Sequence, residues 1–415
     1  MSNTNTFFKE EILDRFLRYV RIDTTSDRHI DKIPSTPGQI KMADLLTAEL
    51  AELGVTDVYR DDHQYIIARI PPRHIETDKY IGFMAHMDTS EDVSGKNVQP
   101  VVRNEYNGED IELESGVVIT TQESPELLRY TGKTIITSSG TTLLGGDDKA
   151  GISEIMAVIK YLKENPEVPH CGLEIIFTPD EETGKGMDFF PVKELKSKCC
   201  YTLDGDSEGI VEAECFSAYK VDVLFSGRVI HLGSARGVLV NPVVLMGKFI
   251  TMLPQNESPE ATDGRYGYYC PLEAKSTLEK AHIELYLRDF ETQEVERRVE
   301  VVRQIAETVS AMYPGSQVEV SPQKQYLNML DHFDKDKRIL SFLKEAISET
   351  GIEPEMKSIR GGTDGARLSE MGIPTPNVSN GSYNYHSLKE WAALPAMVRA
   401  ANVMLGTIQR WTAVS

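Results

Sequence analysis

Short apolar runs alternate with helical repeats along the first half of this chain, and that alternation limits its possible folds more than any other feature. Apolar residues recur at helical spacing in three stretches: 12–20, 42–53 and 149–163. Three short apolar runs are typical of buried strands: 64–70, 80–85 and 173–178. Strands separated by helices predict an α/β fold with a mainly parallel sheet flanked by helices.

The pattern changes near residue 216, which indicates an inserted domain. Strands with alternating faces are expected at 219–226 and 281–287, and helices at 241–253 and from Val295 to Met312. The α/β pattern returns at 328, and further helices are expected around 339–347 and 393–411. We therefore expect a discontinuous α/β domain, residues 1–215 and 328–415, interrupted by an α+β domain, residues 216–327.

The composition excludes several classes of protein. With 40% hydrophobic and 26% charged residues in 415, the chain is neither disordered nor fibrous in type. The net charge of −20 is expected to keep the protein soluble and to repel nucleic acid and anionic membranes. We expect no transmembrane helix and no signal peptide, because the chain lacks both a long apolar run and a basic, then apolar, start.

The five cysteines include no C-x-x-C pair, which fits reduced thiols in a cytoplasm. A metal site in this chain must therefore be built from His, Asp and Glu.

Five segments place carboxylates or imidazoles beside turn residues at the ends of predicted strands, where open α/β sheets hold their sites. They are His86-Met87-Asp88, the GGDDKAG run with Asp147 and Asp148, the PDEETG run with Glu181 and Glu182, Leu203-Asp204-Gly205-Asp206, and Tyr385-His386-Ser387 followed by Glu390. Each alone has an ordinary structural interpretation: a surface pair, helix caps, an acidic loop or a core histidine.

Together, these segments predict a metal site. Three adjacent acids at 180–182 repel one another unless a cation neutralises them. The combined nitrogen and oxygen donors suit zinc or a similar divalent ion, and two ions would need a shared carboxylate. The absence of H-E-x-x-H excludes a zincin.

The order of the motifs HMDT, LLGGDDKAG, FTPDEETGKG, LDGD, RGGTDGA and NYHS, accompanied by PSTPGQ, SGKNVQP and LRDF, identifies a family. It resembles the peptidase T family, the tripeptide aminopeptidases among the di-zinc exopeptidases, which are related to carboxypeptidase G and acetylornithine deacetylase. The similarity extends over nearly the whole chain. It implies a cytoplasmic homodimer that removes the N-terminal residue from tripeptides.

The resemblance also implies two zinc ions per subunit, with cobalt or manganese as alternatives. The implied ligands are His86, Asp147 and Asp204 for one ion, and Asp147, Glu182 and His386 for the other, so that Asp147 bridges. Asp88 would orient His86. Glu181 would be the general base for a metal-bridging hydroxide. The family further implies a cis peptide between Asp147 and Asp148.

The resemblance implies that the inserted domain mediates dimerisation and serves as a lid. His231 would reach the active site of the other subunit and stabilise the oxyanion. Arg288 and Arg360 are candidates for binding the C-terminal carboxylate of a peptide, and Asn241 for binding its carbonyl region. Leu232, Asp206 and Ser387 differ from the residues usual at these positions in the family, and we expect them to affect which substrates are preferred.

Two other functions remain open at this point. A related dipeptidase or N-acyl amino-acid amidohydrolase would use the same metals and base, and it would differ in not requiring the free amine of a tripeptide. An inactive peptide-binding homologue is the third possibility. The presence of Glu181 and of every implied ligand argues against it.

Overall fold

Internal contacts divide the computed structural model, which describes residues 2–414, into two units. The first unit runs to Ala213 and resumes at His332–Lys357 and from Thr363 onward. The second unit comprises Glu214–Asp331 and Ser358–Gly362, and the insert expected from the sequence falls within it. No helix in the described range is long and apolar enough to cross a membrane.

The main sheet has the strand order β1-β2-β8-β3-β9-β16-β10-β15. Its strands are β1 (Asp57–Arg60), β2 (Ile66–Ile70), β3 (Tyr80–His86), β8 (Gly172–Thr178), β9 (Cys200–Gly205), β10 (Ile210–Cys215), β15 (Glu355–Ile359) and β16 (Asn377–Ser379). The four central strands, β8, β3, β9 and β16, run parallel, which confirms the predicted α/β sheet. Outside them, β2 and β10 pair antiparallel with their inner neighbours.

The antiparallel edge strands were not predicted. The loop 61–65 between β1 and β2 is too short for the crossover that a parallel pair requires, so these two strands form a hairpin.

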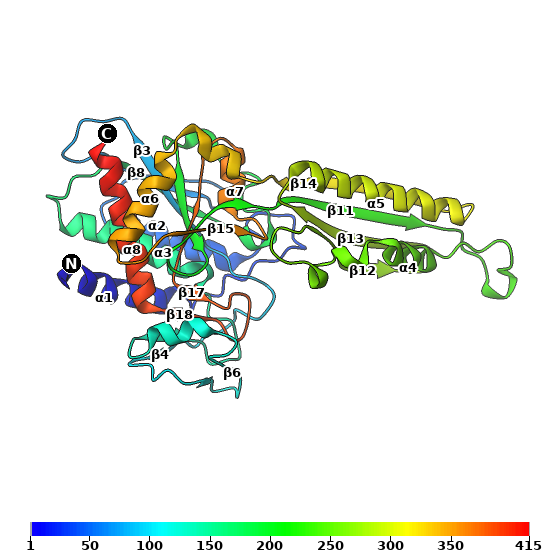
Figure 1. Cartoon of the computed structure of the whole chain (residues 1–415), viewed down its shortest axis with the longest axis horizontal. Coiled ribbons are helices and arrows are strands. Elements are labelled where there is room, and N and C mark those ends of the chain that lie inside the picture. The colour runs from blue at the N-terminus through cyan, green and yellow to red at the C-terminus, as the bar shows by residue number, and fades with distance from the viewer. Residues whose placement is uncertain (1, 415) are drawn as a thin grey trace. The chain divides into compact units, whose positions relative to one another are not determined.

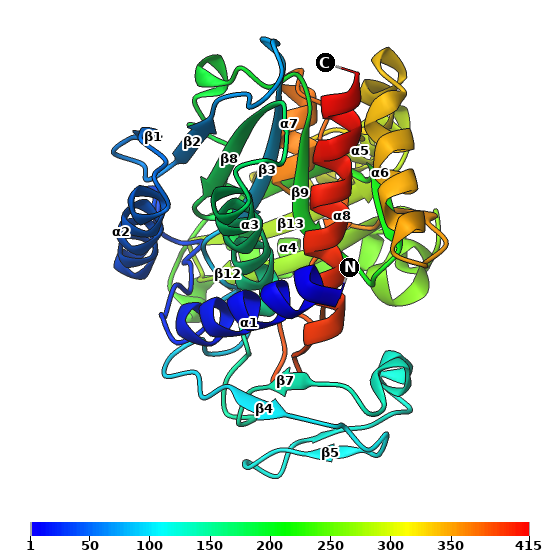
Figure 2. The ribbon, with the colours of Figure 1, turned by 90° about the vertical axis from the view of Figure 1, so that its left-hand side faces the viewer.

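Helices cover this sheet. They are α1 (Ser2–Tyr19), α2 (Pro37–Glu52), α3 (Gly146–Glu164), α6 (Arg338–Glu349), α7 (Asp364–Glu370) and α8 (Leu394–Ala413). Figure 2 shows α1, α3 and α8 side by side in front of the strands, and α3 packs directly on β3 and β9. Because α3 lies between the sheet and the other two helices, it is buried on nearly every side.

Smaller sheets complete the first unit. Their strands are β4 (Val101–Arg103), β5 (Ile111–Glu112), β6 (Val118–Ile119), β7 (Ile135–Thr137), β17 (Ser382–Tyr383) and β18 (Trp391–Ala393). They surround a core in which Trp391 stacks on Tyr383. Strands of two or three residues show no periodicity, so the sequence did not predict them.

The second unit is an antiparallel sheet, β12-β13-β11-β14, with two helices. Its elements are β11 (Ser217–Ser226), α4 (Pro242–Met252), β12 (Tyr268–Ser276), β13 (Lys280–Asp289), α5 (Thr292–Met312) and β14 (Gln317–Tyr326), all labelled in Figure 1. Alternate β11 residues, Val221, Val223 and Phe225, pack in one core with Phe249 and Val302 of the helices. The predicted α+β organisation is therefore confirmed. The edge strands β12 and β14 were missed because β12 is largely exposed and lacks apolar alternation, and the alternation of β14 is limited to Val318 and Val320.

Candidate metal centre

Three of the predicted motifs meet at the carboxyl ends of neighbouring parallel strands. His86 is the last residue of β3, and Asp204 lies near the end of β9. The loop after β8 carries Glu181 and Glu182. Because β8, β3 and β9 are adjacent and parallel, their ends bring these side chains to one edge of the sheet.

Asp147 lies between the two imidazoles of this cluster. Its Oδ1 is 2.9 Å from His86 Nε2, and its Oδ2 is 3.4 Å from His386 Nε2. The same His386 nitrogen is 2.9 Å from Glu182 Oε2, and His86 Nε2 is 3.8 Å from Asp204 Oδ1. The five residues expected to bind metal thus form one continuous cluster with Asp147 at its middle.

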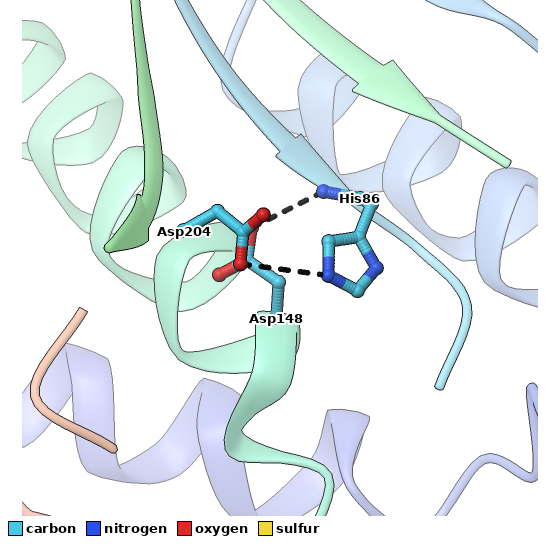
Figure 3. A group of neighbouring side chains, drawn as sticks. All are labelled: His86, Asp148 and Asp204. Carbon is cyan, nitrogen blue, oxygen red and sulfur yellow. Dashed lines mark hydrogen bonds and ion pairs between the residues drawn. The ribbon is translucent and has the colours of Figure 1, made fainter. Parts of the chain in front are cut away.

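Asp148 lies in the same cluster, although the sequence did not single it out as a ligand. Figure 3 shows Asp148 and Asp204 on the same side of His86, with ligand atoms of the three residues within 4.8 Å of one another. Asp148 Oδ2 accepts the backbone N–H of His86 at 3.2 Å, and its Oδ1 accepts Asn380 Nδ2–H at 3.0 Å. These bonds favour a structural role for its carboxylate. The peptide bond between Asp147 and Asp148 is cis, as the resemblance implied.

Each imidazole has a further carboxylate near its outer nitrogen. Asp92 Oδ2 is 3.0 Å from His386 Nδ1, and Asp88 Oδ1 is 3.3 Å from His86 Nδ1. A carboxylate near the outer nitrogen is the usual arrangement of metal-binding histidines. Asp88 was expected beside His86. Asp92 was not expected, because no motif connects it with His386.

The electrostatics of the cluster fit a cation. Burial and the neighbouring charge of Asp147 raise the pKa of Glu182 to about 8 and that of Asp204 to about 7. Burial opposes ionisation of Asp147 as well, but hydrogen bonds from His386 and His86 lower its pKa below the ordinary value. Glu182 Oε1 is buried and has no hydrogen-bond partner among the residues described. Two imidazoles and several crowded carboxylates are a donor set suited to zinc or a similar divalent ion.

Glu390 supports the loop that carries Asp147. Its Oε2 accepts the backbone N–H groups of Leu144 and Gly145 at 2.7 and 2.9 Å, and its Oε1 accepts those of Gly146 and Asp147 at 2.7 and 3.2 Å. The Glu390 side chain is buried. Its place after Tyr385-His386-Ser387 marked it in the sequence, but its partners could not be inferred because they lie far away along the chain.

Glu181 is half-buried, and its carboxylate makes no hydrogen bond to any residue from 2 to 414. Its backbone N–H donates to Asp88 Oδ1 at 3.0 Å, and that of Glu182 donates to Asp88 Oδ2 at 3.1 Å. Burial and the charge of Asp204 raise the pKa of Glu181 well above its ordinary value. An unpaired carboxylate with a raised pKa beside such a cluster suits proton transfer.

The other candidate residues belong to the second unit. His231 is exposed, and its Nδ1 accepts the N–H of Gly233 at 3.2 Å. Asn241 caps α4 by accepting the N–H of Val243 at 3.0 Å. Leu232 is exposed beside His231. The roles of His231 and Asn241 toward a substrate stay predictions.

The two candidate arginines differ in their surroundings. Arg360 donates to the backbone carbonyls of Thr262, Gly264 and Tyr266, which occupies its guanidinium. Arg288 is buried, its Nη1 donates to the backbone carbonyls of Tyr219 and Leu287 at 3.2 and 3.0 Å, and its guanidinium lies over the rings of Tyr286 and Tyr326. No carboxylate in the described part of the chain forms an ion pair with it. Arg288 therefore keeps a buried, unneutralised positive charge.

Two residues of the first unit, Asp206 and Ser387, depart from the family pattern. Asp206 is exposed, and the hydroxyl of Ser387 donates to the backbone carbonyl of Asn384 at 2.7 Å. Any effect of Asp206 or Ser387 on substrate preference stays a prediction.

Once a chelator has removed the metal, we expect the free energy of unfolding to decrease as the pH rises from about 5 to 8. The folded pKa values of Glu182 and Asp204, about 8 and about 7, lie above their ordinary values. The folded chain therefore binds more protons than the unfolded chain, and stability present at low pH is lost as these groups ionise. We expect the melting temperature with EDTA to fall by about 5 °C or more over this range. Scanning calorimetry on zinc-loaded protein is the control, and identical pH dependence in both samples would contradict the prediction.

Comparisons with known proteins show the family to which the chain belongs. The model of peptidase family M20/M25/M40 matches residues 145–410. A peptidase T of Clostridium botulinum is 41% identical over 398 residues, which are 95% of this chain and 98% of the relative. The solved aminopeptidase PepT of Bacillus cereus has a TM-score of 0.74 at 22% identity, over 98% of this chain and 99% of that chain.

A dinuclear metal-binding M20 peptidase of Bacillus subtilis has a TM-score of 0.65 at 15% identity, over 98% of this chain and 99% of that chain. At these identities the two solved structures support the fold, while the family match and the Clostridium relative establish the relationship. The chain belongs to peptidase family M20/M25/M40 and, within it, to the peptidase T group.

Proposed function

We propose that this chain is a cytoplasmic, zinc-dependent aminopeptidase that removes the N-terminal residue from tripeptides and acts as a homodimer. The observation that carries the proposal is the position of Asp147 between the imidazoles of His86 and His386. The identity to a peptidase T over nearly the whole chain supports the substrate class. The reduced cysteines fit a cytoplasmic location.

The proposed ligands follow from the cluster. His86, Asp147 and Asp204 would hold one zinc ion, and Asp147, Glu182 and His386 would hold the other. Cobalt or manganese can replace zinc in such a donor set. When bound, the ions supply Lewis acidity, which polarises a peptide carbonyl and makes water more acidic.

Glu181 is the proposed proton carrier. Its carboxylate accepts a proton from the attacking water and delivers it to the amine that leaves. Asp88 holds the backbone N–H groups of both Glu181 and Glu182, so it fixes the base relative to a ligand. The raised pKa of Glu181 suits both receiving and returning the proton.

The second unit is proposed to bind the substrate and to contact the other subunit of the homodimer. The inserted domain, residues 216–327, would act as the dimerisation and lid domain. The exposed His231 would reach the active site of the partner subunit, where an imidazole can stabilise the oxyanion. Arg288 would bind the C-terminal carboxylate, since its buried charge has no carboxylate partner in residues 2–414.

Replacing Arg288 by glutamine is expected to lower kcat/KM for tri-alanine about 100-fold, mainly through KM, because a charged hydrogen bond to the substrate is lost. Tri-alanine amide, which has no terminal carboxylate, should lose much less. Steady-state assays of both substrates measure the difference. Arg360→Gln is the matched control, because both Nη atoms of Arg360 donate to the segment 262–266, and this variant should not discriminate between the two substrates. Equal losses of Arg288→Gln on both substrates would contradict the role.

A hydrolysis panel on zinc-loaded protein tests the proposed function. Mass spectrometry would follow tri-alanine, di-alanine, tetra-alanine and N-acetyl-tri-alanine. Release of alanine from tri-alanine alone is the expected result. Preference for the dipeptide or the acetylated peptide would instead identify a related dipeptidase or N-acyl amino-acid amidohydrolase. No cleavage at all, with metal shown to be bound, would indicate an inactive peptide-binding protein.

A further inference from the structure

Asp180, the residue before the proposed base, has an unusual backbone conformation. It lies between the end of β8 and Glu181, with φ of 54° and ψ of 29°. Residues other than glycine are uncommon in this left-handed region, although Asp and Asn adopt it more often than most. Such a conformation persists only where the surroundings hold it, and it is often found at functional sites.

Gln39 holds Asp180 by a reciprocal pair of hydrogen bonds. Gln39 Oε1 accepts the backbone N–H of Asp180 at 3.0 Å, and Gln39 Nε2 donates to Asp180 Oδ1 at 2.7 Å. Both residues are fully buried, so water does not compete for these bonds. Gln39 lies in the first turn of α2, and the pair therefore connects this helix to the loop after β8.

Ser35 adds a second support. Its backbone N–H donates to Asp180 Oδ2 at 2.7 Å, and its hydroxyl donates to Asp180 Oδ1. The Asp180 carboxylate is thus bound on both oxygens by the segment Ser35–Gln39, which belongs to the PSTPGQ motif. The proposed reaction assigns no chemical role to that motif.

The side chain of Glu181 depends on this support. Its carboxylate has no hydrogen bond to any residue in the described range, so only its backbone and packing set its direction. That backbone is held by Gln39 at the N–H of residue 180 and by Asp88 at the next two N–H groups. The backbone that carries the Glu181 side chain is therefore held from both sides, by Gln39 through Asp180 and by Asp88.

We propose that Gln39 and Ser35 are positioning residues for peptide hydrolysis, acting through Asp180 on Glu181. The inference rests on the proposed function, because it presumes that Glu181 carries the proton. Neither Gln39 nor Ser35 is part of the metal cluster, and neither is expected to touch substrate.

The first test is Gln39→Ala in the zinc-loaded enzyme. We expect kcat for tri-alanine to fall about 30- to 100-fold, because a small misplacement of a catalytic group has an effect of this size. KM and the bound zinc should stay unchanged, since the ligand cluster and Arg288 are untouched. Gln409→Ala, an exposed glutamine on α8, is the matched control and should keep wild-type kcat. An unchanged kcat in Gln39→Ala would overturn the inference.

A rescue experiment separates positioning from general folding. Gln39→Glu alone sets two buried carboxylates against each other, and Asp180→Asn alone leaves an NH2 group facing either the Gln39 NH2 group or the Ser35 backbone N–H. The double variant Gln39→Glu with Asp180→Asn restores one donor opposite one acceptor. We expect kcat to be low in each single variant and to recover at least about tenfold in the pair. If kcat does not recover, the inference fails, even where Gln39→Ala is too unstable to assay.

A double-mutant cycle distinguishes failure of this inference from failure of the proposed function. In a Glu181→Ala background, Gln39→Ala should cause no further loss, because it acts only through the base. A multiplied loss would mean that Gln39 acts by another route and would overturn the inference. Wild-type turnover in Glu181→Ala would instead remove the proposed mechanism itself.

Discussion

Replacing Glu181 by alanine is expected to lower kcat for tri-alanine about 10²- to 10⁴-fold, the usual contribution of a general acid–base group. The carboxylate is half-buried and makes no hydrogen bond to another residue of the described chain, so its removal breaks no internal contact of that kind. Burial and the charge of Asp204 raise the pKa of Glu181 well above its ordinary value, the direction that suits a general acid–base group.

The measurement must separate chemistry from metal binding. The groups of side chains able to hold an ion contain His86, Asp147 and Glu182, or His86, Asp148 and Asp204, and Glu181 is in neither. Glu181→Ala should therefore keep its zinc, as measured by elemental mass spectrometry on the same sample as the turnover assay. Glu353→Gln, at an exposed glutamate of the first unit, is the control for a lost carboxylate. Unchanged turnover, or zinc lost together with activity, would contradict the role of Glu181 as a base.

The ligand cluster could be predicted because it is built where strands end. Alternation of strands and helices predicted the parallel sheet and the strands β3 and β8, whose polar ends meet at one edge. No range was predicted for β9, which brings Asp204 to the same edge. Residues 86 and 88 of an extended chain point to the same side, so Asp88 was expected near His86. The pairing of ligands around Asp147, by contrast, came from the family resemblance and not from spacing.

The supporting residues could not be predicted because their contacts join distant segments. Glu390 binds the loop before α3, Asp92 binds His386, and Gln39 binds Asp180. No periodicity or turn signal connects such pairs, since each depends on how whole elements pack. Asp180 shows the same limit, because its left-handed backbone follows from partners that the local sequence does not contain.

Replacing Asp147 by asparagine is the second change for which we expect a large effect. The two oxygens of Asp147 face the nitrogens of His86 and His386, so one carboxylate serves both halves of the proposed centre. An asparagine loses the charge and turns one acceptor into a donor. We expect activity to fall about 10⁴-fold or more and bound zinc to fall from two ions to one or none, because removal of a bridging ligand weakens both sites.

Asp148→Asn is the comparison that decides whether Asp147 or Asp148 is the shared ligand of the cluster. Asp148 is also buried beside His86 and Asp204, but it accepts N–H groups from His86, Asn380 and Gly151. An asparagine at 148 keeps one oxygen acceptor, so Asp148→Asn should lower stability and retain most of the zinc. If Asp148→Asn loses zinc while Asp147→Asn keeps it, the bridging role belongs to Asp148. Because both substitutions replace a buried aspartate of the cluster by the same residue, a difference in zinc content between them reports which of the two carboxylates binds the ions.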